Sequence, residues 1–121
     1  MIKFKSLNQS KQFQNILKKK KLNTKYFSIY FGKTSDVAKE NSSKKLNISF
    51  VMKKKIGNAV VRNKIKRKLK SAVRKILEER QPIDLNYTYV IFGKNNVYKD
   101  KFQLIFSEIN EVFKRIKSKG I

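Results

Sequence analysis

Cysteine and histidine are both absent from this chain of 121 residues. Without cysteine the protein has no disulfide and no thiolate metal site, and its composition is compatible with a reducing cytosol. Without histidine it lacks the usual general base and the most common transition-metal ligand. Carboxylates are therefore the remaining candidates for metal-assisted chemistry on the protein.

Acidic residues are also scarce, with eight Asp and Glu against 31 Lys and Arg. A two-metal nuclease needs clustered carboxylates. Only Glu78, Glu79 and Asp84 are near one another, around an expected helix end, where capping and solvation are the ordinary roles of such groups. We therefore predict no catalytic residue and no metal site on the protein, and autonomous nuclease activity is a disfavoured alternative.

Long hydrophobic runs are missing, because no segment approaches the ~20 apolar residues of a membrane span. Residues 1–11 are basic but lack the apolar stretch of a signal peptide. The expected location is therefore the cytoplasm, with no membrane partner. A cationic protein on a membrane surface is a further alternative, but its helices would need larger exposed apolar faces than a packed domain permits.

The residues that are present suit one compact, strongly basic domain, which we expect to span residues 1–121. Hydrophobic residues make up 40% of the chain, enough for a core, and the formal net charge is +23. Solubility alone requires a magnitude of roughly 2–8. A chain with this excess charge repels itself, and a polyanion relieves the repulsion. Nucleic acid is the expected partner, because each neutralised phosphate releases condensed counterions.

Hydrophobic periodicity predicts a layered α+β domain. Expected helices cover residues 7–20, 59–79 and 102–116, and expected strands cover residues 26–31, 46–52 and 87–92. Residues 1–6 are expected to form a loose basic tail and residues 32–45 a surface loop, and Pro82 bars continuation of the second helix. The predicted architecture is a two-layer sandwich with a small mixed sheet packed against helices. Its order is α-β-β-(β)-α-β-α, with a crossover through the second helix.

The second expected helix separates apolar and basic residues onto different faces. Between Lys53 and Lys75 the sequence has eleven basic residues and no acidic one. Steps of three or four place an apolar stripe on one side, made of Val61, Ile65, Leu69, Ala72 and Ile76. The opposite side carries Arg67, Lys70 and Arg74, and the positions between carry Arg62 and Lys66. Helix faces meant only for solvent usually mix charges of both signs, so this pattern predicts contact with nucleic acid.

The segment from Lys54 to Arg67 resembles the signature of the bacterial ribonuclease P protein subunit. It reads Lys-Lys-Ile-Gly-Asn-Ala-Val-Val-Arg-Asn-Lys-Ile-Lys-Arg, where the family's usual form is Lys-Lys-x-Gly-Asn-Ala-Val-x-Arg-Asn-Arg-x-Lys-Arg. The resemblance implies an α+β sandwich with a left-handed crossover through the basic helix. It also implies a large catalytic RNA as partner, precursor transfer RNA as substrate and hydrolytic removal of the 5′ leader. Magnesium would be bound mainly by the RNA subunit.

Two binding surfaces follow when the resemblance is carried over residue by residue and the outward cations of the helix are added. The expected RNA contacts are Lys54, Lys55, Asn58, Arg62, Asn63, Lys64, Lys66, Arg67, Lys70 and Arg74. The expected leader cleft is lined by Phe13, Leu17, Ser28, Tyr30 and Lys94. Four positions depart from the family. Lys64 replaces a preferred Arg, so a bidentate fork becomes a point charge, and Leu17 replaces a frequent aromatic. Lys53 stands where a small hydroxyl residue is common, and Val51 replaces a frequent Ser.

Simpler roles remain open for three of the cleft residues. Phe13 is one of them, because one face of a short helix must pack somewhere. Alternation in the first expected strand places Tyr26, Ser28 and Tyr30 on one face, so the residues alone favour a half-buried core position for Tyr30. Lys94 directly follows the third expected strand, and most lysines at the end of a strand are simply solvated. The resulting prediction is a non-catalytic subunit of ribonuclease P that requires no protein oligomer. The main alternative is a general RNA-binding or ribosomal protein without a role in transfer RNA processing, which explains the charge but not the ordered signature.

Overall fold

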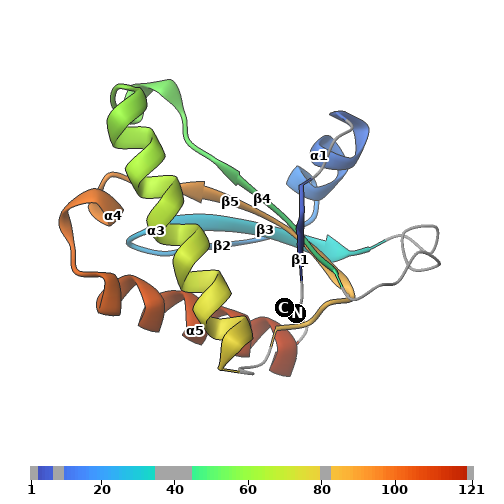
Figure 1. Ribbon diagram of the computed structural model, residues 1–121. Helices are drawn as coiled ribbons and strands as arrows, with labels where there is room; N and C mark the ends of the chain where they lie inside the picture. The colour runs from blue at the N-terminus through green and yellow to red at the C-terminus, as the bar shows by residue number, and fades with distance from the viewer. Residues whose placement is uncertain (1–2, 7–9, 35–44, 80–82, 120–121) are drawn as a thin grey trace.

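The computed structural model describes residues 3–6, 10–34, 45–79 and 83–119. Its elements are, in chain order, β1 (Lys3–Lys5), α1 (Ser10–Leu17), β2 (Lys20–Asn23), β3 (Phe27–Lys33), β4 (Lys45–Val51), the 3₁₀ turn η1 (Lys54–Ile56), α3 (Ala59–Glu78), β5 (Tyr87–Gly93), α4 (Asn96–Lys99) and α5 (Phe102–Lys119). Within the described ranges, five strands form one mixed sheet in the order β1-β4-β5-β3-β2 (Figure 1). The predicted α+β fold is confirmed.

Strand β5 is the centre of the sheet, as its nearly continuous apolar sequence suggests. It pairs in parallel with β4 and antiparallel with β3, so that Phe92 lies between Val51 and Ser28. The edge strands are β1, parallel to β4, and β2, antiparallel to β3. Helix α3 is the crossover between the parallel strands β4 and β5, and the left-handed sense of that crossover stays a prediction.

The turn into α3 depends on Gly57 and Asn58. Gly57 has a φ of 156°, a backbone angle that residues other than glycine rarely adopt. A Cβ added there would lie 3.2 Å from the Val61 side chain. Asn58 caps the helix, because its Oδ1 accepts a hydrogen bond from the Val61 N–H at 3.0 Å. The predicted cap is therefore confirmed, and α3 ends within one residue of its expected end.

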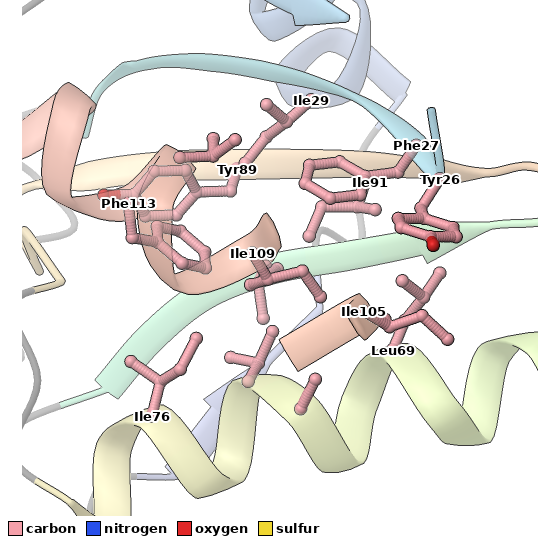
Figure 2. Packing of buried hydrophobic residues seen from close by; sticks show 14 of the residues in the cluster. Tyr26, Phe27, Ile29, Leu69, Ile76, Tyr89, Ile91, Ile105, Ile109 and Phe113 are labelled. Atoms are coloured by element: carbon pink, nitrogen blue, oxygen red, sulfur yellow. The ribbon is translucent and has the colours of Figure 1, made fainter. Parts of the chain in front are cut away.

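The main core lies between one face of the sheet and the helices α3 and α5 (Figure 2). The apolar stripe of α3 supplies Ile65, Leu69, Ala72 and Ile76, all fully buried, and α5 supplies Ile105, Ile109, Val112, Phe113 and Ile116. Tyr89 of β5 meets Phe113 edge to face, with ring centroids 5.1 Å apart. Burying each of these large side chains stabilises the fold by about 1.5–3 kcal/mol. The predicted inward face of the basic helix is confirmed.

Helix α1 lies on the opposite face of the sheet from α3 and α5 (Figure 1). Its Ile16 is buried there, and so is Val90 of β5, although neither belongs to the main core. Alternation along β3 sends Ser28 and Tyr30 to this second face. The second face is therefore only partly covered, by one short helix.

Several predicted boundaries are wrong. The expected loose tail contains β1, which is held at the edge of the sheet by pairing with β4 and by Phe4, whose ring centroid lies 6.2 Å from that of Phe50. The first helix ends at Leu17, earlier than expected, because residues 20–23 form strand β2, whose lysine-rich sequence has little apolar alternation. Strand β3 continues to Lys33, while residues 35–44 of the expected loop and Pro82 lie outside the described residues.

The predicted face of Tyr26 is also wrong. This side chain is 5% exposed and belongs to the main core, not to the face that carries Tyr30. Tyr26 precedes β3, and the Thr24 hydroxyl accepts hydrogen bonds from the N–H groups of Tyr26 and Phe27, which bends the chain there. Strand alternation therefore does not extend to Tyr26, whose hydroxyl donates to Asp100 Oδ2 at 2.6 Å.

No helix in the described ranges combines the length and the apolar character needed to cross a bilayer.

Candidate nucleic-acid interface

One row of α3 cations, which we call the basic ridge, consists of Arg62, Lys66, Lys70 and Arg74. These residues are spaced four apart, so they follow one another along the helix surface. The ridge runs beside β4 and the edge strand β1. Near Arg62 and Lys66, a hollow of about 230 Å³ is also lined by Phe50, Met52, Ala59 and Asn63. At the other end, Arg74 Cζ lies 5.3 Å from the centroid of the Phe4 ring.

The ridge is electrostatically strained in the free protein. The pKa of Lys70 is lowered, first by partial burial and then by the positive charges of Lys66 and Arg74. In the described part of the chain, the buried Nε of Arg62 has no hydrogen-bond partner. An anion bound along the ridge would relieve the repulsion.

Other expected RNA contacts lie around this ridge on exposed surface. Asn63 and Arg67 are exposed on α3, and Lys54 and Lys55 are exposed on η1. Asn58 is exposed as well, but its side-chain oxygen is already used by the helix cap. All ten expected RNA contacts therefore lie on η1, on α3 or at the junction between them, and their binding of RNA stays a prediction.

A second row of lysines on α3, made of Lys64, Lys68 and Lys75, faces α4 and α5. Lys68 Nζ donates to the carbonyl oxygens of Val97, Tyr98 and Asp100 at 3.0, 3.3 and 3.1 Å, which ties α4 to α3. Lys64 Nζ lies 5.0 Å from the centroid of the Tyr98 ring, and Lys75 Nζ lies 4.5 Å from that of Phe106. Lys64 was expected to contact RNA, and the structure shows that it also packs on a protein aromatic ring.

The second face of the sheet carries an aromatic cluster, made of Phe13, Tyr30 and Phe92. Phe92 joins the other two: its ring centroid lies 6.4 Å from that of Phe13 and 5.5 Å from that of Tyr30, edge to face in both cases. Ser28 is the direct pairing partner of Phe92. The three rings are only partly buried. Phe13, Ser28 and Tyr30, three of the expected leader residues, thus converge on one place, while Leu17 is half-buried on α1.

Basic residues surround this aromatic cluster. Lys53 Nζ lies 5.4 Å from the centroid of the Phe92 ring, and Lys21 Nζ lies 5.3 Å from that of Tyr30. Lys94 Nζ donates to Asn23 Oδ1 and to the Thr24 carbonyl oxygen, both at 2.6 Å, so it is held against the turn before β3. Ser28 Oγ donates to the same Asn23 Oδ1 at 2.7 Å. Lys94 therefore stands beside the cluster with two protein acceptors already in place.

Sequence reasoning missed Phe92, Lys21 and Lys53 as members of this surface. The missing information was strand register, because Phe92 reaches Ser28 and Tyr30 only through the pairing of β3 with β5. Four consecutive lysines, Lys18 to Lys21, were a visible signal that a basic surface follows α1. Which of these lysines lies over Tyr30 depends on the pairing of β2 with β3, which no local pattern predicts.

Magnesium, which the family resemblance implies, needs oxygen ligands such as carboxylates. The described ranges contain no group of three or more His, Cys, Asp or Glu side chains that could hold a metal ion. Asp100 accepts from Tyr26 and lies 3.4 Å from Lys25 Nζ, and the Tyr26 hydrogen bond is the main cause of its lowered pKa. The described carboxylates thus do not fit a protein-held magnesium site.

Comparisons with known proteins agree with this geometry. A model of the family described as Ribonuclease P matches residues 1–117. The chain is 31% identical over 118 residues to the ribonuclease P protein component of Carboxydothermus hydrogenoformans, covering 97% of this chain and 95% of that protein. It is also 31% identical over 118 residues to the protein of the same name from Mesomycoplasma hyopneumoniae strain 7448, covering 97% and 96%.

Solved structures show the same fold at lower sequence identity. The ribonuclease P protein of Thermotoga maritima aligns with a TM-score of 0.69 at 22% identity, covering 93% of this chain and 97% of that one. The Staphylococcus aureus protein aligns with a TM-score of 0.67 at 22% identity, covering 93% and 94%. With the family match over nearly the whole length, these findings lead to one conclusion: the chain belongs to the ribonuclease P protein component family.

Proposed function

We propose that this chain is the protein subunit of ribonuclease P and that it uses two surfaces in the holoenzyme. The basic ridge and the exposed residues around η1 bind the RNA subunit. The aromatic cluster and its lysines bind the 5′ leader of precursor transfer RNA. Family membership supports the assembly as a whole, and the assignment of each surface rests on the geometry described above.

Segregation of charge on α3 is the observation that carries the proposal. One side of the helix is fully buried at Ile65 and Leu69, and the other side presents cations with no acidic residue from Lys53 to Lys75. A folded RNA offers closely spaced phosphates to such a surface, and each neutralised phosphate releases counterions. The affinity for RNA should therefore fall steeply with salt, with a log–log slope of about 0.7–0.9 per contacted phosphate.

The aromatic cluster suits single-stranded RNA better than a duplex. Unpaired bases stack on exposed aromatic side chains while cations follow the backbone, and each stacked base contributes about 1–3 kcal/mol. Lys53 Nζ lies 5.4 Å from the centroid of the Phe92 ring, and Lys21 Nζ lies 5.3 Å from that of Tyr30. Cations and aromatic faces therefore alternate over a few residues of the sheet. A leader held here would be positioned by this chain and cut elsewhere.

The proposed chemistry is hydrolysis of the phosphodiester between the leader and the mature 5′ end. The RNA subunit with bound magnesium would supply the catalytic groups. The side chains of this protein bind and orient the substrate: the cations lower the electrostatic cost of bringing two RNA molecules together, and the aromatic rings fix the leader. This division of roles is consistent with carboxylates that do not fit a metal site.

Reconstitution with a bacterial ribonuclease P RNA tests the proposal. Cleavage of precursor transfer RNA at low magnesium should be stimulated by the chain, and Arg67→Ala should weaken the stimulation without changing the melting temperature. The exposed Lys114→Ala on α5 is the matched control and should behave as wild type. Absence of stimulation would favour a general RNA-binding or ribosomal protein, and cleavage by the chain without the RNA subunit would identify it as a nuclease.

A further inference from the structure

A hollow of about 750 Å³ lies at the edge of the sheet where β2 begins, next to the aromatic cluster but lined by other residues. We call it the lysine hollow. The described residues that line it include four lysines and no carboxylate: Lys18, Lys19 and Lys20 follow α1, and Lys33 ends β3. Phe31, Gly32 and Tyr87 complete the lining. Four cations around one concave surface form a site for an anion with several charges.

The lysine hollow borders the aromatic cluster at the edge of the sheet. Lys19 and Gly32 line it from the face that carries Tyr30, and Phe31, Lys33 and Tyr87 line it from the other face. Along β3, Ser28 stands next to Phe92, Tyr30 lies under Lys21, and Gly32 comes next on the same face. The stem of Lys19 lies directly on Gly32, because an added Cβ there would be 2.8 Å from Lys19 Cγ. Four residues of strand span about 13 Å. A strand of RNA that passes over Tyr30 would therefore meet Lys21, then Lys19, and then the hollow.

The position of α3 gives this path a direction. Val51, at the end of β4, pairs with Phe92, and Lys53 stands over the same ring, just before η1 and α3. The RNA-binding helix thus begins at the Phe92 end of the aromatic cluster. The lysine hollow lies at the far end of β3, where Lys33 pairs with Tyr87. Nucleotides of a bound leader that are remote from the RNA subunit would lie at the hollow.

We propose that the lysine hollow is a second subsite for single-stranded RNA, which binds the phosphates of leader nucleotides beyond those on the aromatic cluster. This inference rests on the proposed function, because it needs a leader on the second face of the sheet. The aromatic cluster contacts bases, whereas the hollow offers lysines. The second subsite should therefore be indifferent to sequence and sensitive to salt.

The test uses the reconstituted holoenzyme and precursor transfer RNAs whose leaders are lengthened one nucleotide at a time, from about four to about sixteen. The variant Lys18→Ala/Lys33→Ala removes two exposed cations, while Lys19 and Lys20 keep their contacts with β3. The matched control Lys99→Ala/Lys101→Ala removes two exposed lysines from the region of α4. With wild type and control, affinity should rise again once the leader passes the aromatic cluster.

In the variant this second rise should be lost, and the log–log salt slope for long leaders should fall by about 1.4, from two phosphate contacts at about 0.7 each. Short leaders should bind to wild type and variant equally. Equal gains from long leaders in both proteins, or no second rise in wild type, would overturn the second subsite and leave the proposed function standing. If short leaders also gained nothing from the protein, the aromatic cluster itself would be wrongly assigned.

Discussion

Replacing Lys70 by glutamine should strengthen the fold and weaken RNA binding at the same time. Lys70 is the ridge residue whose pKa is lowered by partial burial and by the charges of Lys66 and Arg74. Glutamine keeps a similar stem and helix propensity, so the variant isolates the charge. Two like-charge contacts at four-residue spacing disappear, each worth about 0.2–0.5 kcal/mol. The free energy of unfolding should therefore rise by about 0.4–1 kcal/mol at low salt, and by less as salt screens the exposed part.

Dependence on pH gives this prediction a second readout. Because the folded state lowers the pKa of Lys70 below its ordinary 10.5, the cost of its charge is fully present at neutral pH. The stability difference between Lys70→Gln and wild type should shrink as the pH rises through the lowered pKa toward 10.5. Urea unfolding across this pH range measures the difference directly.

The second measurement on Lys70→Gln is its affinity for the RNA subunit as a function of salt. The log–log salt slope should decrease by about 0.7–0.9 in Lys70→Gln, because one phosphate contact is lost. Lys114→Gln on α5 is the control and should leave the slope unchanged. A variant that is less stable than wild type at low salt, or one with an unchanged slope, would refute the assignment of Lys70 to a self-repelling, RNA-binding ridge.

Three further predictions concern other parts of the molecule. Ile65→Ala should lower the free energy of unfolding by about 2–5 kcal/mol in denaturant titrations, because the side chain is fully buried, and a loss below about 1 kcal/mol would contradict the assigned helix face. Phe92→Leu should reduce the affinity of the holoenzyme for substrates with a leader by about 1–3 kcal/mol per stacked base while leaving leaderless substrates unaffected, as measured by filter binding. Tyr26→Phe should destabilise the protein above the ordinary Asp pKa of 3.8, because Tyr26 is the main cause of the lowered pKa of Asp100. That difference should disappear in thermal melts as the pH falls below this value, and a difference that persists in acid would show that the hydrogen bond is not its source.

Local sequence periodicity was sufficient to predict α3. The buried stripe at Ile65, Leu69, Ala72 and Ile76 and the cap at Asn58 depend on residues within a few positions of one another, so a sequence determines them without knowledge of the rest of the fold. The exposed position of Arg67 follows from the same spacing. Of the two expected surfaces, the one on η1 and α3 is therefore the one whose position in the fold the sequence predicts more completely.

Pairing between strands that are far apart in the chain could not be predicted from the sequence. Phe92 joins Phe13 and Tyr30 because β5 lies next to β3, and no local pattern records that arrangement. The roles of the lysines depend on tertiary packing in the same way. Lys68, in the middle of the basic segment, binds three carbonyl oxygens near α4 instead of facing solvent. Composition identified a cationic surface, and only the fold separates its structural lysines from those available to a ligand.

The order of strands in the sheet has a consequence for synthesis on the ribosome. Strands β3 and β4 follow one another in the chain, yet neither pairs with the other, because β5 lies between them. A nascent chain that has not yet exposed residues 87–93 therefore has no partner for the inner edge of either strand. Long-range pairing of this kind delays folding until its last participant emerges. The cationic segment is made before β5, so its hydrophobic stripe has no complete sheet to cover until β5 emerges, and transcripts and chaperones would encounter it before the domain has folded.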